Sequence, residues 1–169
     1  MSYLTMNDEK LLPVVIELNT LLADYNMYYQ KLRSFHWNIL GENFFELHKK
    51  FEELYTDSRI KIDEIAERIL TLRYHPMSKY SDYITISSIK ETSPLLTDKE
   101  MIKEMIKDHG KLLVQMKLVN THASNAEDEG TIDLMGAYIR ELEKTTWTLD
   151  AWLKNTKDQL NSSMVKNIS

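Results

Sequence analysis

The sequence predicts an all-α fold, a single bundle of four long helices with one long connection in the middle. Three observations predict it. The 169 residues include only four Gly and three Pro, so the residues that interrupt helices are scarce. Apolar residues recur at alternating steps of three and four along four long stretches. Sequence typical of turns is confined to three places between those stretches.

The first helix is expected from Leu11 to about His36, because one of its faces is continuously apolar. That face carries Leu11, Val15, Leu18, Leu22, Tyr25, Tyr29 and Leu32, and His36 is its next position. A break around Asn38–Gly41 precedes the second long helix, whose apolar face continues to Leu72. This helix should stop before Pro76, since the residue before a proline is disfavoured in the α conformation.

The stretch His75–Leu96 lacks a helical period and is predicted to be a long connection with one short helix around Ser87–Lys90. Thr97 and Glu100 form a capping box that opens a third helix, expected to end near Ala123. The fourth helix follows a polar, Gly-ended turn and carries Met135, Tyr138, Leu142, Thr145, Leu149 and Trp152 on its apolar face.

Two short connections enclosing a long one give two helix pairs joined by a crossover, which is the connectivity of a ferritin-like bundle. We expect one domain over residues 1–169, with short flexible ends at about 1–7 and 160–169. Net charge −5 disfavours nucleic acid as a partner. Without Cys, a secretory signal or a long apolar run, the chain is expected to be cytoplasmic and to have no membrane partner.

Two pairs of potential metal ligands lie on one polar stripe of the second helix. His48 and Glu52 are four residues apart, as are Asp63 and Glu67, so each pair projects from one face a turn apart. The pairs are separated by about 22 Å and cannot bind one ion within a subunit. An antiparallel second copy crossing near residues 57 and 58 would set His48 against Glu67 and Glu52 against Asp63. His36, just across the break, would be able to complete each site.

Two imidazoles and three carboxylates suit Fe(II) or Mn(II), with Zn(II) as a competitor. The chain contains no Glu-x-x-His motif, which di-iron sites inside a bundle use. The sequence therefore favours a metal site between subunits. A solvated helix face without function is the alternative for each pair taken alone. His109 lies on an apolar face and is expected to be a hydrogen-bonded core residue rather than a ligand.

These motifs resemble those of the Dps proteins, the starved-cell DNA-binding proteins or mini-ferritins. The resemblance extends over nearly the whole chain. It rests on three segments, His36-Trp37-x-Ile39-x-Gly41, Leu47-His48-x-x-x-Glu52, and Asp63-x-Ile65-Ala66-Glu67-Arg68 with the following Pro76.

The resemblance implies a hollow dodecamer with ferroxidase centres at two-fold interfaces. His36, His48 and Glu52 would come from one subunit, and Asp63 and Glu67 from its neighbour. Such an enzyme oxidises Fe(II), typically with hydrogen peroxide, and stores the ferric mineral, which protects DNA and the cell from oxidative stress. The expected location is the cytoplasm, free or associated with the nucleoid.

Two further roles follow from the resemblance. Asp128, Glu129 and Asp133 fall where the family places its three-fold entry pores, although an acidic first turn also compensates the helix dipole. Trp37 either intercepts a stray oxidising equivalent or simply packs at the helix end.

The chain departs from the family at three points. It has Glu52 where most members have Asp, Arg73 where a Gly or another turn former is usual, and no Lys-rich tail. Because DNA binding in the family is commonly tied to such tails, direct DNA binding is expected to be weak or absent near neutral pH.

Two other functions stay open at this point. One is a nucleoid-binding architectural protein with a vestigial metal site. The other is a helical scaffold or receptor-binding protein without chemistry, which the presence of all five ligand residues disfavours.

Overall fold

The computed structural model describes residues 4, 6 and 8–154, so the expected flexible ends lie almost wholly outside the described residues. Within the described residues the structure contains helices and no strands, as predicted. A short 3-10 turn, Asp8–Lys10, precedes α1 (Leu11–Asn38), α2 (Phe44–Thr71), α3 (Tyr80–Ile86), α4 (Asp98–Asn125) and α5 (Glu129–Leu153).

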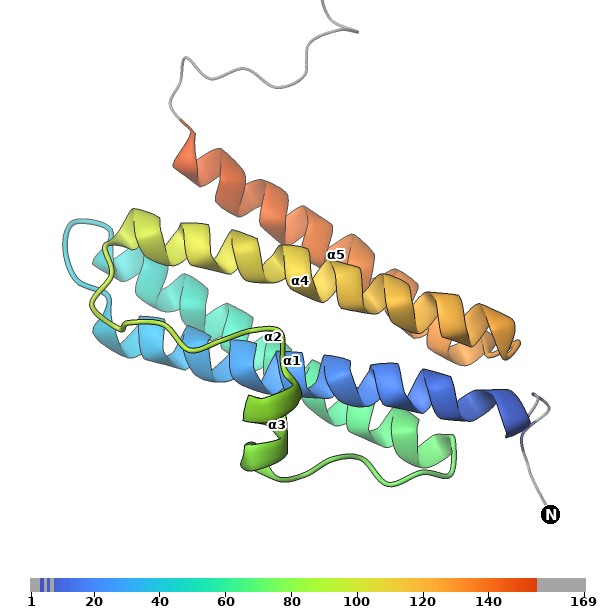
Figure 1. Ribbon diagram of the computed structural model, residues 1–169. Coiled ribbons are helices and arrows are strands. Elements are labelled where there is room, and N and C mark those ends of the chain that lie inside the picture. The colour runs from blue at the N-terminus through green and yellow to red at the C-terminus, as the bar shows by residue number, and fades with distance from the viewer. Residues whose placement is uncertain (1–3, 5, 7, 155–169) are drawn as a thin grey trace, which may run out of the picture.

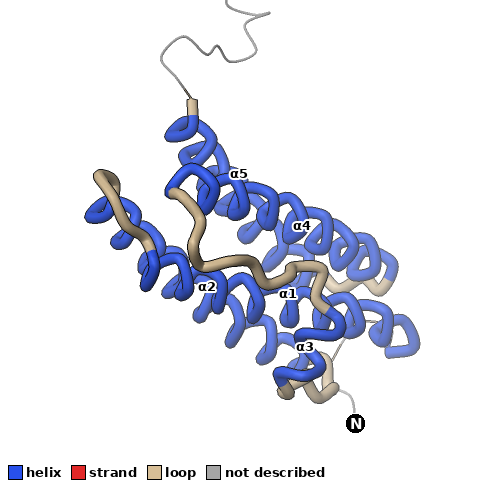
Figure 2. Tube along the Cα trace, turned by 60° about the vertical axis from the view of Figure 1, so that its left-hand side comes forward, coloured by secondary structure: helices blue, strands red, loops and turns tan. Residues whose placement is uncertain are grey.

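The four long helices form two antiparallel pairs, α1 with α2 and α4 with α5 (Figure 1). The pairs meet mainly through α1 and α4. The connection from α2 to α4 returns along the length of the bundle, which Figure 2 shows as a long loop interrupted by α3. The ferritin-like connectivity predicted from the loop lengths is therefore confirmed.

Helix α1 is the centre of the core because it packs against α2, α3 and α4. Its predicted apolar face is buried, apart from the half-buried Tyr29. Val14, Leu21, Tyr28 and Phe35 are buried as well. A helix with three neighbours buries more than one stripe of side chains, so the three-four spacing alone underestimates its core.

The short helix of the crossover is Tyr80–Ile86, and the prediction that it lies around Ser87–Lys90 is wrong. Residues 87–90 are not helical and instead attach the crossover to the bundle. The Ser87 hydroxyl and the Ser88 backbone N–H donate to the buried carboxylate of Asp24, at 2.8 and 2.7 Å. The sequence pattern did not reveal Asp24, because an acidic residue inside an apolar helix face gives no period of its own.

Helices α2 and α4 end in the same type of C-terminal cap. The second residue beyond each helix has a positive φ, 71° at Arg73 and 58° at Glu127. The next backbone N–H bonds back into the last turn, from Tyr74 to Ile69 O and from Asp128 to Ala123 O. Helix α4 therefore ends at Asn125, slightly beyond the expected Ala123. The capping box predicted at its start is present.

Replacing Arg73 by Gly is expected to raise the free energy of unfolding by about 1 kcal/mol, because a side chain at positive φ is strained and Gly is not. Urea unfolding of the wild type and the variant measures the difference. Lys144→Gly, in the middle of α5, is the control and should lower stability by about 1 kcal/mol. A destabilised Arg73→Gly variant would contradict the assigned cap.

A buried polar network joins α1, α4 and α5. Tyr28 Oη lies 2.6 Å from His109 Nε2, and His109 Nδ1 lies 2.7 Å from Thr146 Oγ1. The Thr146 hydroxyl donates its proton to Leu142 O, so its oxygen accepts from His109 Nδ1–H. With that proton on Nδ1, His109 Nε2 accepts from the Tyr28 hydroxyl. The prediction of a hydrogen-bonded core histidine is therefore confirmed. Burial lowers the pKa of His109 to about 4.

His109 is expected to make the fold acid-sensitive. Its pKa is about 4 in the fold and about 6.5 in the unfolded chain, so the unfolded state binds the extra proton between these values. The free energy of unfolding should fall by up to about 1.4 kcal/mol per pH unit as the pH drops from 6.5 towards 4. Urea unfolding across this range measures the slope. His109→Gln keeps a donor and an acceptor without titrating, and equal slopes in both proteins would contradict the prediction.

Candidate metal centre

His36 and His48 face each other across the turn between α1 and α2. The turn is tight because Gly41 adopts a φ of 100°, which a side chain disfavours. His36 lies in the last turn of α1 and His48 in the second turn of α2. Their rings are stacked, with centroids 3.8 Å apart and an interplanar angle of 21°. The predicted approach of these two histidines is thus present within one subunit.

A reciprocal pair of hydrogen bonds fixes both imidazoles. His36 Nδ1 lies 2.7 Å from His48 O, and His48 Nδ1 lies 2.8 Å from His36 O. A carbonyl oxygen only accepts, so each Nδ1 carries a proton and each neutral ring has its lone pair on Nε2. Neither Nε2 has a hydrogen-bond partner within the described part of the chain. This is the tautomer that a histidine needs to bind a metal through Nε2.

Aromatic rings enclose the two imidazoles. Phe44 stacks on His48 with centroids 4.9 Å apart, and Tyr55 and His36 form a T-shaped pair with centroids 5.3 Å apart. The Tyr55 hydroxyl lies 3.5 Å from Glu52 Oε1. Partial desolvation and the Glu52 carboxylate raise the pKa of Tyr55, so its hydroxyl stays protonated and donates. Glu52 therefore lies on the same side of the molecule as both histidines.

Asp63 and Glu67 lie farther along the exposed face of α2. They are separated from His48 and Glu52 by about 22 Å, at 1.5 Å per residue. The structure thus divides the five predicted ligands into a group of three and a pair. In the described residues of one subunit, no three His, Asp or Glu side chains are placed to hold a metal ion.

Trp37 follows His36 and is 58% exposed. The Arg33 guanidinium lies 4.8 Å from the centre of its ring and 5.3 Å from that of Tyr29. Trp37 is therefore a surface side chain held by a cation–π contact, and it does not pack into the bundle core.

The three candidate pore residues differ in exposure. Glu129 and Asp133 are exposed near the start of α5. Asp128 is fully buried, accepts from the Thr131 backbone N–H at 3.0 Å and is paired with Arg68 of α2. Its carboxylate thus caps α5 and binds Arg68, which leaves Glu129 and Asp133 as the exposed acids.

Sequence reasoning missed three residues around these groups. Tyr55 lies one turn after Glu52 on the same polar stripe, which was a usable signal. Phe44 is the first residue of α2, and its sequence position indicates only that it belongs to an apolar helix face. Arg68 belongs to a family motif, but its pairing with Asp128 had no local signal, because Asp128 is 60 positions away in the chain.

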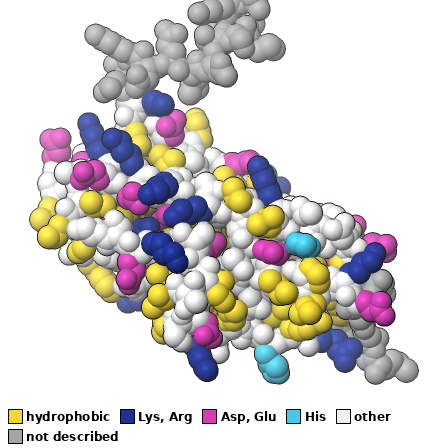
Figure 3. Space-filling model, in the orientation of Figure 1, with side chains coloured by type: hydrophobic (Ala, Val, Ile, Leu, Met, Phe, Trp, Pro, Cys, Tyr) yellow, Lys and Arg dark blue, Asp and Glu magenta, His cyan; other side chains and the backbone are white. Residues whose placement is uncertain are grey.

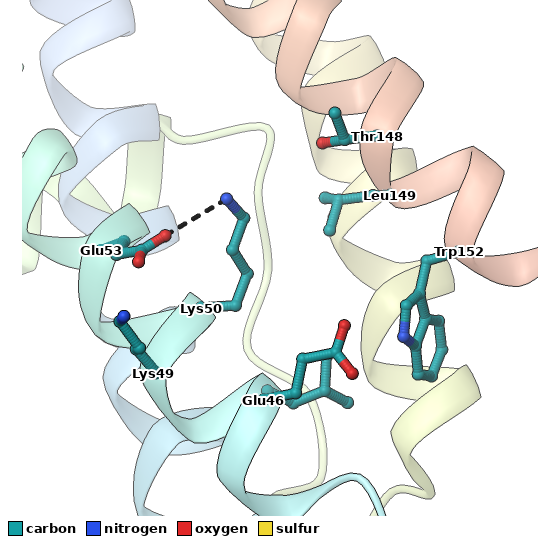
Figure 4. Close-up of a pocket in the computed structure, with 8 residues that line it drawn as sticks. Glu46, Lys49, Lys50, Glu53, Thr148, Leu149 and Trp152 are labelled. Atoms are coloured by element: carbon teal, nitrogen blue, oxygen red, sulfur yellow. Dashed lines mark hydrogen bonds and ion pairs between the residues drawn. The ribbon is translucent and has the colours of Figure 1, made fainter.

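A cleft of about 340 Å³ lies elsewhere, between the start of α2 and the end of α5 (Figure 4). On the α2 side of the cleft, Lys50 Nζ forms an ion pair with Glu53 Oε2 at 3.3 Å. The α5 side is formed by Thr148, Leu149 and Trp152. The cleft contains no histidine, and its charges are mixed, so it is not a candidate for the metal centre. None of the described helices is long and apolar enough to cross a membrane.

Comparisons with known proteins agree with the ferritin-like fold. A ferritin-like domain matches residues 16–158. The DNA protection during starvation protein 2 of Bacillus anthracis is 44% identical, over 83% of this chain and 96% of that protein. The corresponding protein of Brevibacillus brevis is 38% identical, over 83% of this chain and 95% of its own.

Solved structures give the same result. The Dps protein of Vibrio cholerae O1, described as a member of a superfamily of ferritin-like diiron-carboxylate proteins, aligns with a TM-score of 0.87 at 42% identity. The alignment covers 91% of this chain and 98% of that one. The Dps protein of Bacillus brevis aligns with a TM-score of 0.84 at 37% identity, over 86% and 98% of the two chains. This chain is a member of the Dps family of ferritin-like proteins.

Proposed function

We propose that the protein is a ferroxidase and iron-storage shell whose metal centres are shared between two subunits. The observation that carries the proposal is the reciprocal hydrogen bonding of His36 and His48. It fixes both rings with Nε2 free and pointing away from the backbone that holds them. A purely structural histidine pair would be expected to use its second nitrogens in the fold.

The symmetry of α2 supports a shared centre. His48 and Glu67 are equally far from the midpoint of the helix, between Asp57 and Ser58, and so are Glu52 and Asp63. A two-fold axis through that midpoint brings each group of three ligands to the partner's carboxylate pair and makes two equivalent centres. The result is two imidazoles and three carboxylates per centre, suited to iron, with Mn(II) and Zn(II) as competitors.

Each centre would bind Fe(II) as substrate. Two ferrous ions give up one electron each to one hydrogen peroxide, which takes up two protons and leaves as two waters. The three carboxylates favour the ferric product because Fe(III) is the harder ion, and the imidazoles keep the substrate ions in place. Tyr55 contacts both kinds of ligand, since its hydroxyl lies 3.5 Å from Glu52 Oε1 and its ring packs against His36. Ferric ions then collect as mineral inside a dodecameric shell, which lowers oxidative stress.

Glu129 and Asp133 are the acids that we propose to line the route of Fe(II) entry. Both are exposed at the start of α5, where the positive end of the helix dipole also favours carboxylates. An acidic entry raises the local concentration of cations. Asp128 is left out of this proposal because it is buried.

Direct DNA binding is proposed to be weak or absent. The net charge is −5, and Figure 3 shows Lys and Arg interspersed with Asp, Glu and hydrophobic side chains on one face of the molecule. The Lys and Arg side chains that lie near one another on this face have Asp and Glu among them, and the overall negative charge repels phosphates. Protection of DNA would then come from removal of Fe(II) and peroxide. Trp37, exposed beside His36, is the candidate to intercept a stray oxidising equivalent.

Anaerobic loading with Fe(II), at no more than two ions per subunit, followed by peroxide tests the ferroxidase proposal. The absorbance of the ferric product should rise faster with the protein than in protein-free buffer. It should also rise faster than with protein that was preloaded with Zn(II). Oxidation at the protein-free rate would refute the proposed function. The ligand variants that locate the centre are treated in the Discussion.

A further inference from the structure

Three buried tyrosines form a row through the bundle core that the proposed iron chemistry does not use. Tyr28 and Tyr25 of α1 are T-shaped neighbours with ring centroids 6.5 Å apart, and Tyr25 and Tyr138 of α5 have centroids 6.3 Å apart. None of the three residues is more than 4% exposed. Aromatic rings this close together can exchange an electron, so the row is a route for a single oxidising equivalent through the core.

The inner end of the row has a base in place to receive a proton. Tyr28 Oη lies 2.6 Å from His109 Nε2. Thr146 accepts from His109 Nδ1–H at 2.7 Å, so the lone pair of Nε2 faces the phenol. Burial lowers the pKa of His109 to about 4, which keeps this lone pair free near neutral pH. Burial also raises the pKa of Tyr28 well above its usual range, so the phenol keeps its proton until it is oxidised.

The other two tyrosines are less suited to hold an oxidising equivalent. The Tyr25 hydroxyl is buried and has no hydrogen-bond partner among the described residues, so its proton has no acceptor. Tyr138 is the outer end of the row, because its hydroxyl donates to the exposed Glu64 of α2. The Lys61 ammonium lies 5.1 Å from the centre of the Tyr138 ring, and its positive charge opposes the loss of an electron there. The equivalent should therefore come to rest at Tyr28.

We propose that Tyr28 and His109 form a buried redox site that stores one oxidising equivalent. A hydroxyl radical at the surface, or a protein radical that it produces, takes one electron from Tyr28 through the row and is itself reduced by one electron. The phenolic O–H bond breaks and its proton moves to His109 Nε2, which leaves a neutral phenoxyl radical and an imidazolium. One electron from a reductant such as Fe(II) or a thiol, together with the return of the same proton, restores both side chains.

His109 can accept this proton although burial makes it a weak base. A phenol that has lost an electron is a far stronger acid than an imidazolium, so a base with a pKa of about 4 still takes up its proton. Burial then protects the product. Phenoxyl radicals disappear mainly by coupling to one another, and Tyr28, at 2% exposure, is out of reach of a ring from another molecule. The site thus differs from Trp37, which is 58% exposed.

Photochemical oxidation of the protein prepared without iron tests the site. A ruthenium tris-bipyridine complex is excited by a light flash in the presence of an electron-accepting quencher, and the Ru(III) so formed removes single electrons from the protein. Electron paramagnetic resonance of samples frozen after the flash should show a tyrosyl radical that outlives the radicals at the surface. Its spectrum should include hyperfine coupling to one proton that His109 Nε2 donates to the phenoxyl oxygen. Absence of a long-lived tyrosyl radical would overturn the inference.

Three variants locate the radical. Tyr28→Phe should abolish the long-lived signal. His109→Gln keeps a hydrogen-bond acceptor but removes the base, so the yield of the radical should fall by more than about tenfold. Tyr25→Phe is the matched control, because it removes a hydroxyl that has no partner among the described residues, and it should retain the signal. A signal that survives Tyr28→Phe, is unchanged in His109→Gln or disappears in Tyr25→Phe would overturn the inference.

The radical measurement and the iron assay are independent, because the flash experiment contains no iron. A long-lived radical at Tyr28 in a protein that oxidises Fe(II) no faster than buffer would leave the redox site standing and refute the ferroxidase. Rapid Fe(II) oxidation without this radical would do the reverse.

Discussion

Replacing His48 by Ala is expected to lower the initial rate of peroxide-dependent Fe(II) oxidation by more than about 100-fold, because even the loss of an outer-shell partner costs 10- to 100-fold. Replacing Asp63 by Ala should have the same effect. In the fold, Asp63 lies about 22 Å from His48 along α2, so an effect of this size on one reaction requires a second subunit. Stopped-flow absorbance at low Fe(II) measures both rates.

Mixing the two inactive variants should restore activity. In a dimer of one His48→Ala and one Asp63→Ala subunit, one centre contains both changes, and the other takes intact ligands from each chain. Dissociation and reassembly of an equal mixture makes half of the dimers mixed. About a quarter of the wild-type rate is therefore expected.

A matched mixture provides the control. His36→Ala and His48→Ala damage the same group of three ligands, so no centre in their mixed dimer is intact. This mixture should stay inactive. Restoration in both mixtures would mean that the assay reports refolding rather than shared centres, and restoration in neither would contradict a centre shared across a two-fold axis.

The long helices could be predicted from the sequence because their cores repeat at three-four spacing and few Gly or Pro interrupt them. The position of the short helix within the crossover could not, since that helix depends on tertiary contacts. Tyr83 is buried, and the following serines bond to Asp24 of α1. The sequence pattern predicts the helix at Ser87–Lys90, where those bonds instead attach a non-helical segment to α1.

The same distinction applies to the candidate site. Ligand pairs four residues apart on one helix can be recognised in the sequence, because helix geometry alone makes them neighbours. The reciprocal bonds between His36 and His48 depend on how two helices meet at Gly41. Asp128 illustrates the same limit. The family resemblance places it at an entry pore, and its pairing with Arg68 could not be predicted because the two residues are distant in sequence.

Replacing Asp128 by Ala is expected to lower the free energy of unfolding by about 3 kcal/mol or more, because removing one member of a buried ion pair leaves the other charge without its partner. Asp128 is fully buried, and the Arg68 side chain is only 19% exposed. Arg68 Nε also donates to Thr131 Oγ1 at 2.9 Å, and this hydroxyl donates to Asp128 Oδ2 at 2.5 Å. The variant therefore loses the pair and the cap of α5 together.

Two control variants separate these contributions. Asp128→Asn keeps a side-chain acceptor for the cap and removes the charge. Its free energy of unfolding should therefore fall by less, about 1–2 kcal/mol. Gly130→Ala leaves both partners in place but sets a methyl group 2.9 Å from Arg68 Nη2, which forces the guanidinium to move. In urea unfolding, Asp128→Ala should have the lowest free energy of unfolding of the three variants.

Because Arg68 follows Glu67, displacement of its side chain should also disturb one proposed ligand. Gly130→Ala is thus expected to slow Fe(II) oxidation, whereas Lys144→Gly, far from this contact, should not. An Asp128→Ala protein as stable as the wild type would show that Arg68 finds another partner or water at no cost. In that case Asp128 would again be available as a residue of the entry route.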